Sequence, residues 1–389
     1  MQVPLLDLKP QYRALKAEID AAIEGLCNTQ AFILGPAVRQ LEAEVAAYSG
    51  CTHGIGVSSG TDALLVALMA LDIGAGDAVI TTPYTFFATA GTIARSGALP
   101  LFVDIDPATY NLDPNKVAEL LQGECEQRGG RLVHRASGTV VKAIMPVHLY
   151  GQMADMTPLM ALARDFDLKV IEDAAQAIGS QYCTPGEHGF AGTMGHIGTT
   201  SFFPSKNLGC FGDGGAIFTN DDDLAQRLRS MANHGQTVKY QHDILGLNSR
   251  LDTLQAAVLM AKLPHLHDFE KSRRAVAARY DEALGSLDGL EIPDRTVDSS
   301  HVFHQYTMTC KTAAMRDGLK MYLAEHEIPS MIYYPRPLFL QTAYKQVVSM
   351  PISEDLCNRV LSLPICPELD VEQQNYIILN IQNFIQKSQ

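Results

Sequence analysis

Short apolar runs and helical repeats alternate along the first two hundred residues of the chain. Five runs rich in apolar and β-branched residues predict strands over 54–57, 78–82, 101–104, 140–147 and 169–171. Apolar residues recur at i, i+3 and i+4 in the intervening stretches, which predicts helices over 11–26, 63–71, 88–96, 114–121 and 156–166. Strands and helices that alternate in this way predict a mostly parallel sheet with helices on both faces.

The pattern changes in the second half of the chain. The elements expected there are a helix over 224–231, a long helical stretch over 251–284, strands over 307–310 and 330–333, and helices over 316–325 and 371–386. This mixture predicts a smaller α+β domain after the parallel sheet. We therefore expect an α/β fold with a large domain over 1–250 and a small C-terminal domain over 251–389. Two glycine-containing stretches interrupt the pattern: 122–138 reads as a surface excursion, and 183–198 as a loop or hairpin.

Composition narrows the classes of function. The chain has 389 residues, 47% of them hydrophobic, which is enough to bury a large core, and its net charge of −13 argues against a nucleic-acid partner. The eight cysteines show no C-x-x-C pair and no histidine at metal-ligand spacing, so we expect reduced, mostly buried thiols and no metal site. The start lacks the features of a signal peptide, and the best apolar run is too short to span a bilayer. We expect a soluble cytoplasmic protein.

The stretch SFFPSKNLGCFGDGG, residues 201–215, holds one lysine between an aromatic, proline-containing approach and a glycine-rich exit. Tight turns on both sides would fix Lys206 in one place. A lysine that attacks a carbonyl needs such a setting, because it must meet its target in one geometry and lose its proton. From these residues alone, a solvated lysine on a glycine loop is about equally plausible.

Three other stretches carry side chains of matching chemistry. Residues 58–62 lead from a strand into a helix, and the free amides of such a turn bind anions, although an ordinary capped helix is the commoner outcome. Asp173 follows a strand, so it is placed to hold a protonated ring nitrogen or, alternatively, to cap a helix that starts at Ala174. TPYTFFATA, residues 82–90, offers an aromatic face for a flat ligand, although a single Phe is usually a core residue. Together with Lys206 these features match the needs of pyridoxal 5'-phosphate.

The chain resembles the DegT/DnrJ/EryC1/StrS family of sugar aminotransferases, which are fold-type I pyridoxal phosphate enzymes. The motifs that carry the resemblance are LLDLKPQY, GTDAL, YTFFATA, HLYGQ, EDAAQ, SFFPSKNLG, GDGGAIFTND, NHGQ, GLNSRLDTLQAA and YYPRPL. The resemblance implies that Lys206 carries the cofactor as a Schiff base, and family members that dehydrate have histidine there instead. The other implied cofactor contacts are Asp173 to the ring nitrogen, Gln176 to the phenolic oxygen, Phe86 to the ring, and Gly60, Thr61, Ser201 and the second subunit's Asn248 to the phosphate.

The likeness is greatest to members that act on UDP-2-acetamido-2-deoxy-3-oxo-glucuronate. It implies a homodimer with shared active sites that moves an amino group from L-glutamate to this nucleotide-linked ketosugar, for lipopolysaccharide O-antigen synthesis. Arg250 would clamp the sugar carboxylate, unless it only pairs with Asp252, and Tyr333 and Tyr334 would line the sugar pocket. Close relatives have histidine where Tyr333 stands, and the 122–138 excursion is longer than expected. The same reaction on a 4-oxo or 6-deoxy sugar, or a non-catalytic regulator on this fold, are the alternatives.

Overall fold

The structure, a computed structural model, describes the chain except residues 2, 185, 296–298, 345 and 389. Its central sheet follows the order β1-β11-β10-β7-β6-β2-β3, and the hairpin of β4 and β5 joins the edge through β6. Strand β11 is antiparallel to both neighbours, and β10, β7, β6, β2 and β3 run parallel. The bounds are β1 His53–Val57, β2 Asp77–Thr81, β3 Leu99–Phe102, β4 Cys125–Arg128, β5 Arg131–His134, β6 Val140–Met145, β7 Lys169–Asp173, β10 Ile197–Ser201 and β11 Gly215–Thr219. The mostly parallel sheet expected from the sequence is confirmed.

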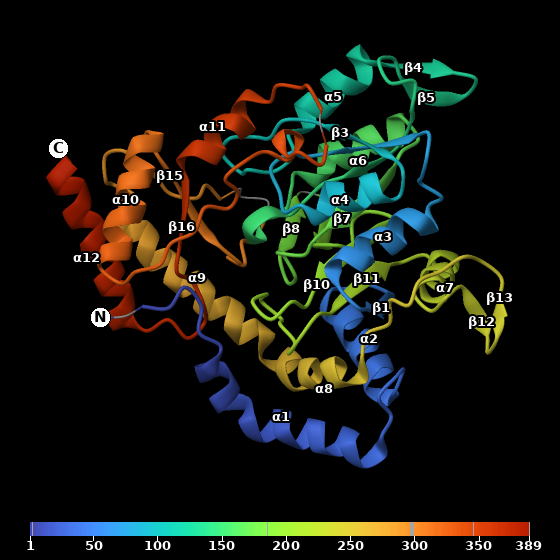
Figure 1. Cartoon of the computed structure of the whole chain (residues 1–389), viewed down its shortest axis with the longest axis horizontal. Coiled ribbons are helices and arrows are strands. Elements are labelled where there is room, and N and C mark those ends of the chain that lie inside the picture. The colour runs from blue at the N-terminus through green and yellow to red at the C-terminus, as the bar shows by residue number, and fades with distance from the viewer. Residues whose placement is uncertain (2, 185, 296–298, 345, 389) are drawn as a thin grey trace.

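Helices cover both faces of this sheet because successive strand residues point to opposite sides. Ala78 and Ile80 pack against α5 and α6, whereas Val79 between them packs on the side of α3 and α7 (Figure 1). Strands buried on both faces read as continuous apolar runs, and this made them recognisable in the sequence. The helices are α3 Gly60–Ala70, α4 Ala88–Arg95, α5 Pro114–Gly123, α6 Met156–Asp165 and α7 Asp222–Met231.

Three further helices cover the end of the sheet formed by β10 and β11. Phe202, Phe218 and Leu251 pack with α2 and α8, and α1 packs in turn on α8. The helical stretch expected over 251–284 forms α8 and α9, which are separated by the 3-10 turn η2 at Leu263–His265, because Pro264 in this turn cannot donate a helical hydrogen bond. The bounds are α1 Lys9–Thr29, α2 Pro36–Tyr48, α8 Thr253–Lys262 and α9 Leu266–Leu284.

The C-terminal part has its own core around a three-stranded antiparallel sheet, β14-β15-β16. The strand expected over 330–333 is wrong: Met331 makes one isolated bridge to Ser362, and the chain then turns toward the large sheet. Helix α11 and strand β16 escaped prediction because they follow one another without a turn residue between them. Val3 joins this core, and the N-terminus lies beside α12 in Figure 1. The bounds are β14 Leu290–Glu291, β15 Tyr306–Cys310, α10 Ala313–Glu325, α11 Pro351–Arg359, β16 Val360–Leu363 and α12 Val371–Ser388.

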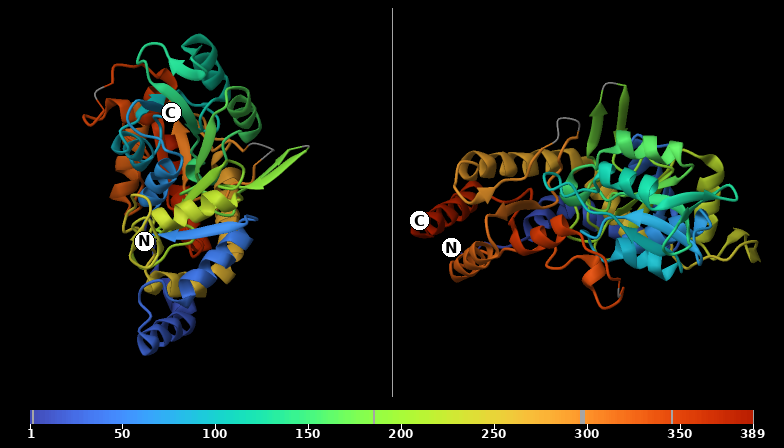
Figure 2. Two further views of the ribbon diagram at one scale, coloured as in Figure 1. Left: turned by 90° about the vertical axis from the view of Figure 1, so that its right-hand side faces the viewer. Right: turned by 90° about the horizontal axis from the view of Figure 1, so that it is seen from above.

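The two glycine-containing stretches both form hairpins. The 122–138 excursion is the β4–β5 hairpin, and the 183–198 stretch contains the β8–β9 hairpin, which projects from the body in Figure 2. All eight cysteines are free, and six of them are buried. None of the helices in the described part of the chain combines the length and apolar character needed to cross a bilayer. The remaining elements are β8 Gln181–Thr184, β9 Glu187–Phe190, β12 Gln236–Val238, β13 Gln241–His242, and the 3-10 turns η1 Leu149–Gly151 and η3 Leu338–Leu340.

Candidate active site

The predicted site residues gather at the carboxyl ends of the parallel strands. Asp173 is the last residue of β7 and pairs with Thr199 of β10, and Ser201 ends β10 two residues later. Phe86 lies between the end of β2 and the start of α4. Ligands of open α/β sheets bind at this edge, so these side chains stand where a cofactor is expected.

Asp173 is held by two hydrogen bonds. Its Oδ2 accepts from the Thr89 hydroxyl at 2.8 Å, and its Oδ1 accepts from the Ala175 N–H at 3.2 Å. The carboxylate is buried, with 5% of the residue exposed. No helix follows Asp173, because residues 175–179 form turns, so the alternative role of Asp173 as the cap of a helix starting at Ala174 is wrong. A buried carboxylate with a fixed direction is suited to pair with a protonated ring nitrogen.

Gln176 is fixed at both ends of its amide. Its Oε1 accepts from the Tyr150 N–H at 2.6 Å, and its Nε2 donates to the Tyr334 hydroxyl at 3.1 Å. The second hydrogen on Nε2 is the donor that a phenolate oxygen would require. The Tyr334 ring lies 6.4 Å from the ring of Phe86, whose side chain is well exposed. Gln176 and Phe86 therefore meet at Tyr334.

Buried tyrosines hold the segment that carries Tyr333 and Tyr334. The Tyr84 hydroxyl donates to the carbonyl of Tyr333 at 3.0 Å, and the Tyr150 hydroxyl donates to the same oxygen. Both donors lie on connections that follow strands of the large sheet, β2 for Tyr84 and β6 for Tyr150, so they dock the C-terminal part onto the site. Burial raises the pKa of the Tyr334 phenol, which keeps it a proton donor at neutral pH.

Lys206 lies in a tight loop with its amine in a desolvated position. The backbone N–H of Lys206 donates to the Phe203 carbonyl at 2.8 Å. A Cβ at Gly209 would lie 2.3 Å from the Pro204 oxygen, so this loop requires glycine there. Burial lowers the pKa of the Lys206 amine to about 8, while Asp173 acts in the opposite direction. Roughly a tenth to a fifth of this lysine is therefore neutral near physiological pH, far more than of an ordinary lysine, and the neutral amine is the form that acts as a nucleophile and proton carrier.

His304 is a neighbour of Lys206 that the sequence did not single out. Burial lowers the pKa of its imidazole, and the charges of Lys206 and Arg273 lower it further. Its Nδ1 is buried and has no hydrogen-bond partner in the described part of the chain. The segment reaches the site because the Asn207 amide donates to the Val302 carbonyl at 3.1 Å. A neutral imidazole therefore borders the lysine.

The start of α3 forms a cradle against the end of β10. Ser59 caps the helix by accepting from the Asp62 N–H at 3.0 Å, which leaves the first-turn amides of Gly60 and Thr61 directed outward. A Cβ at Gly60 would lie 2.8 Å from the Cβ of Ser201, so the serine hydroxyl stands beside the helix start. Amides, a hydroxyl and the positive helix end fit a phosphate. With Lys206, Asp173 and Gln176 at the same edge, these residues fit pyridoxal phosphate.

Asn248 and Arg250 flank Ser249, whose carbonyl accepts from the Ser58 N–H at 3.1 Å, so their segment runs beside the turn that leads into α3. Asn248 is exposed and bridges Asn233, while Arg250 pairs through its backbone with Val57 of β1. The Arg250 guanidinium donates to the Asn233 side chain at 3.1 Å. Within the described residues it makes no ion pair with Asp252, so the local pair considered as the alternative does not form.

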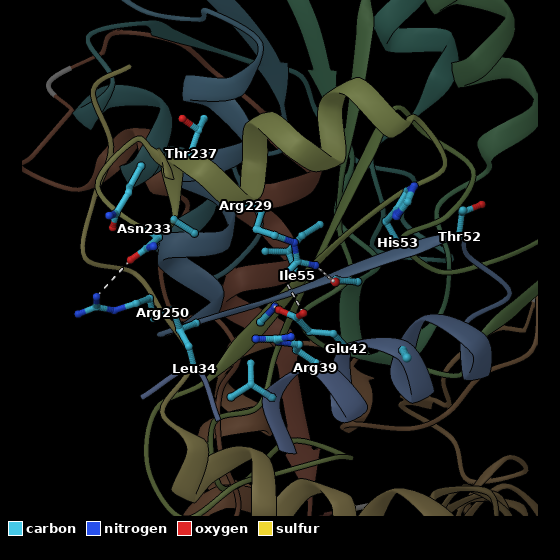
Figure 3. A pocket seen from close by; sticks show the side chains of 16 residues that line it. Leu34, Arg39, Glu42, Thr52, His53, Ile55, Arg229, Asn233, Thr237 and Arg250 are labelled. Atoms are coloured by element: carbon cyan, nitrogen blue, oxygen red, sulfur yellow. Dashed lines mark hydrogen bonds and ion pairs between the residues drawn. The ribbon is translucent and has the colours of Figure 1, made fainter. Parts of the chain in front are cut away.

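Arg250 lines a cavity of about 580 Å³ bordered by α2, β1 and α7 (Figure 3). Arg39, Glu42 and Arg229 lie on its wall, and the Arg229–Glu42 pair spans it at 2.7 Å. Lys206, Asp173 and Gln176 do not line this cavity. Arg250 and the lysine therefore do not share this cavity.

Several residues that shape the site were not assigned a role from the sequence: Thr89, Tyr84, Tyr150, His148, Glu172 and His304. All but His304 lie inside or beside motifs that were recognised, YTFFATA, HLYGQ and EDAAQ. Proximity to a motif was the available signal, and nothing in the local pattern marked His304.

Comparison with known proteins matches residues 13–382 to the DegT/DnrJ/EryC1/StrS aminotransferase family. A "pleiotropic regulatory protein" of Geobacillus stearothermophilus is 47% identical, with 99% of each chain covered. UDP-N-acetyl-3-dehydro-alpha-D-glucosamine 3-aminotransferase of Acidithiobacillus ferrooxidans is 45% identical, with 95% of each covered. UDP-2-acetamido-2-deoxy-3-oxo-D-glucuronate aminotransferase of Pseudomonas aeruginosa is 41% identical over 98% of this chain and 100% of its own.

Solved structures agree with this assignment. A DegT DnrJ EryC1 StrS aminotransferase from Brucella abortus has a TM-score of 0.91 at 40% identity, covering 98% of this chain and 99% of its own. S. venezuelae DesV, in complex with a ketimine intermediate, has a TM-score of 0.90 at 39% identity, with 99% of each covered. The fold-type I architecture and the cofactor expected from the resemblance are confirmed. The chain belongs to the DegT/DnrJ/EryC1/StrS aminotransferase family, and it is a pyridoxal-phosphate-dependent sugar aminotransferase.

Proposed function

We propose that this chain transfers an amino group from L-glutamate to UDP-2-acetamido-2-deoxy-3-oxo-glucuronate, as a cytoplasmic homodimer that serves O-antigen synthesis. The observation that carries the choice of sugar is the Arg250 guanidinium, which has only a neutral amide as its side-chain partner among the described residues. Its planar fork is suited to a carboxylate. The Pseudomonas aeruginosa relative, named for this substrate, supports the choice at 41% identity.

Lys206, Asp173 and Gln176 would each have a separate role in the reaction. Bound pyridoxal phosphate supplies an electrophilic carbon and a ring that accepts negative charge. Lys206 would hold the cofactor through its amine and, once that amine is free, would carry a proton to and from the reacting carbon atoms. Its pKa of about 8 suits both the loss and the return of a proton near neutral pH. Asp173 would keep the ring nitrogen protonated, and Gln176 would donate to the phenolic oxygen.

The substrate pocket would be lined by tyrosine hydroxyls. Tyr334 accepts from the Gln176 amide, so its own proton remains to be donated, and the sugar is the partner we propose for it. Tyr333 is partly buried beside it. Gly60, Thr61 and Ser201 would bind the cofactor phosphate through amides and a hydroxyl.

An exposed apolar patch supports a second copy of the chain as partner. It consists of Phe32, Ile33, Leu34, Phe211 and Leu254, each between 40% and 54% exposed. Ile33 bridges Asp252, and the Phe211 N–H donates to Gln255 at 2.9 Å, so loop 32–34, Phe211 and the start of α8 lie together. Contiguous exposed apolar surface marks protein contacts. Leu254 of this patch lies four residues after Arg250, and Ile33 bridges Asp252, so the patch adjoins the segment that carries Asn248 and Arg250, which fits their proposed passage to a neighbouring active site.

The experiment that tests this proposal offers the purified enzyme and L-glutamate to a panel of UDP- and dTDP-linked ketosugars, with mass spectrometry of the products. We expect preferred amination of the UDP-linked 3-oxo-uronate. Preference for a 4-oxo or 6-deoxy sugar would contradict the proposal. The Acidithiobacillus relative favours a second candidate, the uncharged UDP-linked 3-oxo-glucosamine, and equal turnover of both 3-oxo sugars would select against the carboxylate clamp.

The Geobacillus relative is named as a regulator, so the same preparation should be tested for chemistry as well as binding. An active aminotransferase loses the visible absorbance of its cofactor when L-glutamate is added, whereas a regulator that only binds cofactor keeps it. Loss of the band with L-glutamate but not with other amino acids would also identify the donor.

A further inference from the structure

Next to Asp173 lies a buried carboxylate–histidine pair, Glu172 and His148, which the reaction does not use directly. Glu172 and His148 are both fully buried, and the His148 Nε2 lies 2.7 Å from Glu172 Oε2. The Glu172 carboxylate also accepts three backbone N–H groups, from Gly192 at 2.9 Å, Met194 at 2.7 Å and Gly195 at 2.5 Å. Four donors therefore converge on two oxygens, which stabilises the ionised carboxylate.

The hydrogen bonds also determine the tautomer of His148. Its Nδ1 lies 3.1 Å from the Ala154 N–H, which can only donate, so Nδ1 carries no proton. The ring proton is then on Nε2 and is donated to Glu172. The pair is a neutral imidazole and a carboxylate, and neither group has a spare position for substrate.

The same pair fixes the main chain around Asp173. The His148 N–H donates to the Asp173 carbonyl at 3.0 Å, and the Asp173 N–H donates to the Pro146 carbonyl at 2.9 Å. Two residues further along, the Tyr150 N–H holds Gln176. Because neighbouring strand residues point to opposite faces, Glu172 lies on the far side of the sheet from the Asp173 carboxylate.

We propose that Glu172 and His148 are positioning residues that set the direction of the Asp173 carboxylate toward the cofactor ring. They clamp three segments together: the end of β7, the 146–151 connection and the 192–195 loop. The proposal rests on Asp173 being the partner of the ring nitrogen. Loss of the clamp allows the end of β7 to shift, and a displacement of about 1 Å in a catalytic group can cost on the order of 100-fold in rate.

Glu172→Gln is the direct test because it keeps the shape of the side chain. Its NH2 group must face two N–H donors whichever way the amide is turned, so the clamp is broken on one side. We expect kcat to fall by about 10- to 100-fold with little change in KM. We also expect the pH midpoint of the cofactor's visible absorbance to rise, because a misplaced Asp173 leaves less positive charge on the ring. In cofactor-free protein, the amides of Gly192, Met194 and Gly195 should exchange hydrogen faster.

Asp104→Asn is the matched control. Asp104 is also a buried carboxylate with four donors, which come from Ile105, Ile352 and both the N–H and hydroxyl of Ser353. None of these belongs to the segments clamped around Asp173. The control should lose stability yet keep the absorbance midpoint of the wild type. An equal shift of the midpoint in both variants would overturn the proposal.

Two variants of His148 provide a second test if Glu172→Gln fails to fold. His148→Gln retains a donor for Glu172, whereas His148→Leu removes it and leaves the three backbone donors in place. The midpoint should stay near the wild-type value in the first variant and move in the second, and identical values would contradict the proposal. Asp173→Asn separates the two claims. If it leaves the midpoint unchanged, the role of Asp173 fails; if it moves the midpoint and Glu172→Gln does not, only the positioning role fails.

Discussion

Two lysines, Lys206 and Lys262, lie beside the same glycine-rich turn. The amine of one is hydrogen-bonded and the amine of the other is free, and this difference distinguishes a structural lysine from a reactive one. Burial lowers the pKa of both Lys206 and Lys262. Lys262, on α8, is 2% exposed and donates from Nζ to the Gly209 carbonyl at 2.7 Å, with the Phe211 ring 5.0 Å away. Lys206 has no side-chain hydrogen bond to the described residues, and its electrostatic partner is Asp173.

The difference shows that desolvation alone does not identify a nucleophile. The Lys262 amine donates a hydrogen bond to a carbonyl of the turn and packs over an aromatic ring, so Lys262 stabilises the loop that carries Lys206. Lys206 keeps its amine unbound and borders a carboxylate and the neutral imidazole of His304. A reactive lysine combines a lowered pKa with a free lone pair and a defined approach.

Replacing Lys206 should produce the largest effect. Lys206→Ala is expected to abolish turnover while the fold persists, because no other group in the site offers a free amine. Borohydride reduction of the wild type, followed by peptide mass spectrometry, should place the cofactor on the peptide that contains Lys206. Cofactor on the peptide that contains Lys262 would reverse the comparison.

Mixing inactive chains tests whether another subunit completes the Lys206 site. Asn248→Ala should be inactive through loss of the phosphate contact that we propose between subunits. Heterodimers with Lys206→Ala each contain one site with both residues intact, so mixing should restore part of the activity. A fully active Asn248→Ala enzyme, or a mixture that stays inactive, would contradict the sharing of active sites through Asn248.

Arg250 is a third cation to compare with the two lysines. Its guanidinium donates to the side-chain amide of Asn233, whereas Lys262 donates to a backbone carbonyl. Arg250→Ala leaves a bound carboxylate unpaired, at a cost of about 2–5 kcal/mol, or roughly 30- to several-thousand-fold in catalytic efficiency. We expect that loss with the 3-oxo-uronate and a much smaller one with an uncharged ketosugar. Measured kcat/KM for both substrates gives the answer, and equal losses would make Arg250 a structural residue like Lys262.

Asp173 is the partner that Lys206 has and Lys262 lacks. Asp173→Asn should keep cofactor binding but lower kcat by on the order of 100-fold, because a neutral amide no longer stabilises the protonated ring. Single-turnover absorbance with L-glutamate measures the step. The neighbouring Thr89→Val, which removes one hydrogen bond to the carboxylate, serves as a milder companion and should lose less. Near-normal turnover of Asp173→Asn would reduce Asp173 to a turn residue.

The sequence predicted these residues to the extent that they lie at strand ends or tight turns. Asp173 ends a run of apolar residues, and Lys206 is bracketed by proline and glycine, so the local pattern marked both as candidates, and the family resemblance supplied their expected roles. The partners of these residues come from distant segments: Thr89 reaches Asp173 from α4, and the hydroxyl of Tyr334 reaches Gln176 from the C-terminal part. Such contacts depend on how the layers pack, which no local spacing encodes.

The errors in the fold have similar causes. Residues 330–333 have the apolar character of a strand, yet the carbonyl of Tyr333 bonds to Tyr84 and Tyr150 of the large sheet instead of continuing a ladder. The polar stretch 122–138 was expected to be a surface excursion, and within it β4 and β5 pair as an edge hairpin, a pairing that the local pattern did not predict. Tertiary contacts decided both outcomes.

The smallest expected effects are on stability, and the two lysines should differ in sign. In cofactor-free protein Lys206 loses its proton near pH 8 when folded but near 10.5 when unfolded. The unfolded state therefore binds more protons between these values, so this residue makes stability rise with pH across that window. Below pH 8 its burial costs roughly 3 kcal/mol.

Lys206→Met should remove much of this cost at pH 7 and give little gain near pH 10. Lys262→Met instead leaves the Gly209 carbonyl without its donor, which should cost about 1–3 kcal/mol. Urea unfolding of both cofactor-free variants at pH 7 and pH 10 measures the difference. Destabilisation of both at pH 7 would show that Lys206 also holds its loop, and the distinction between the two lysines would then rest on reactivity alone.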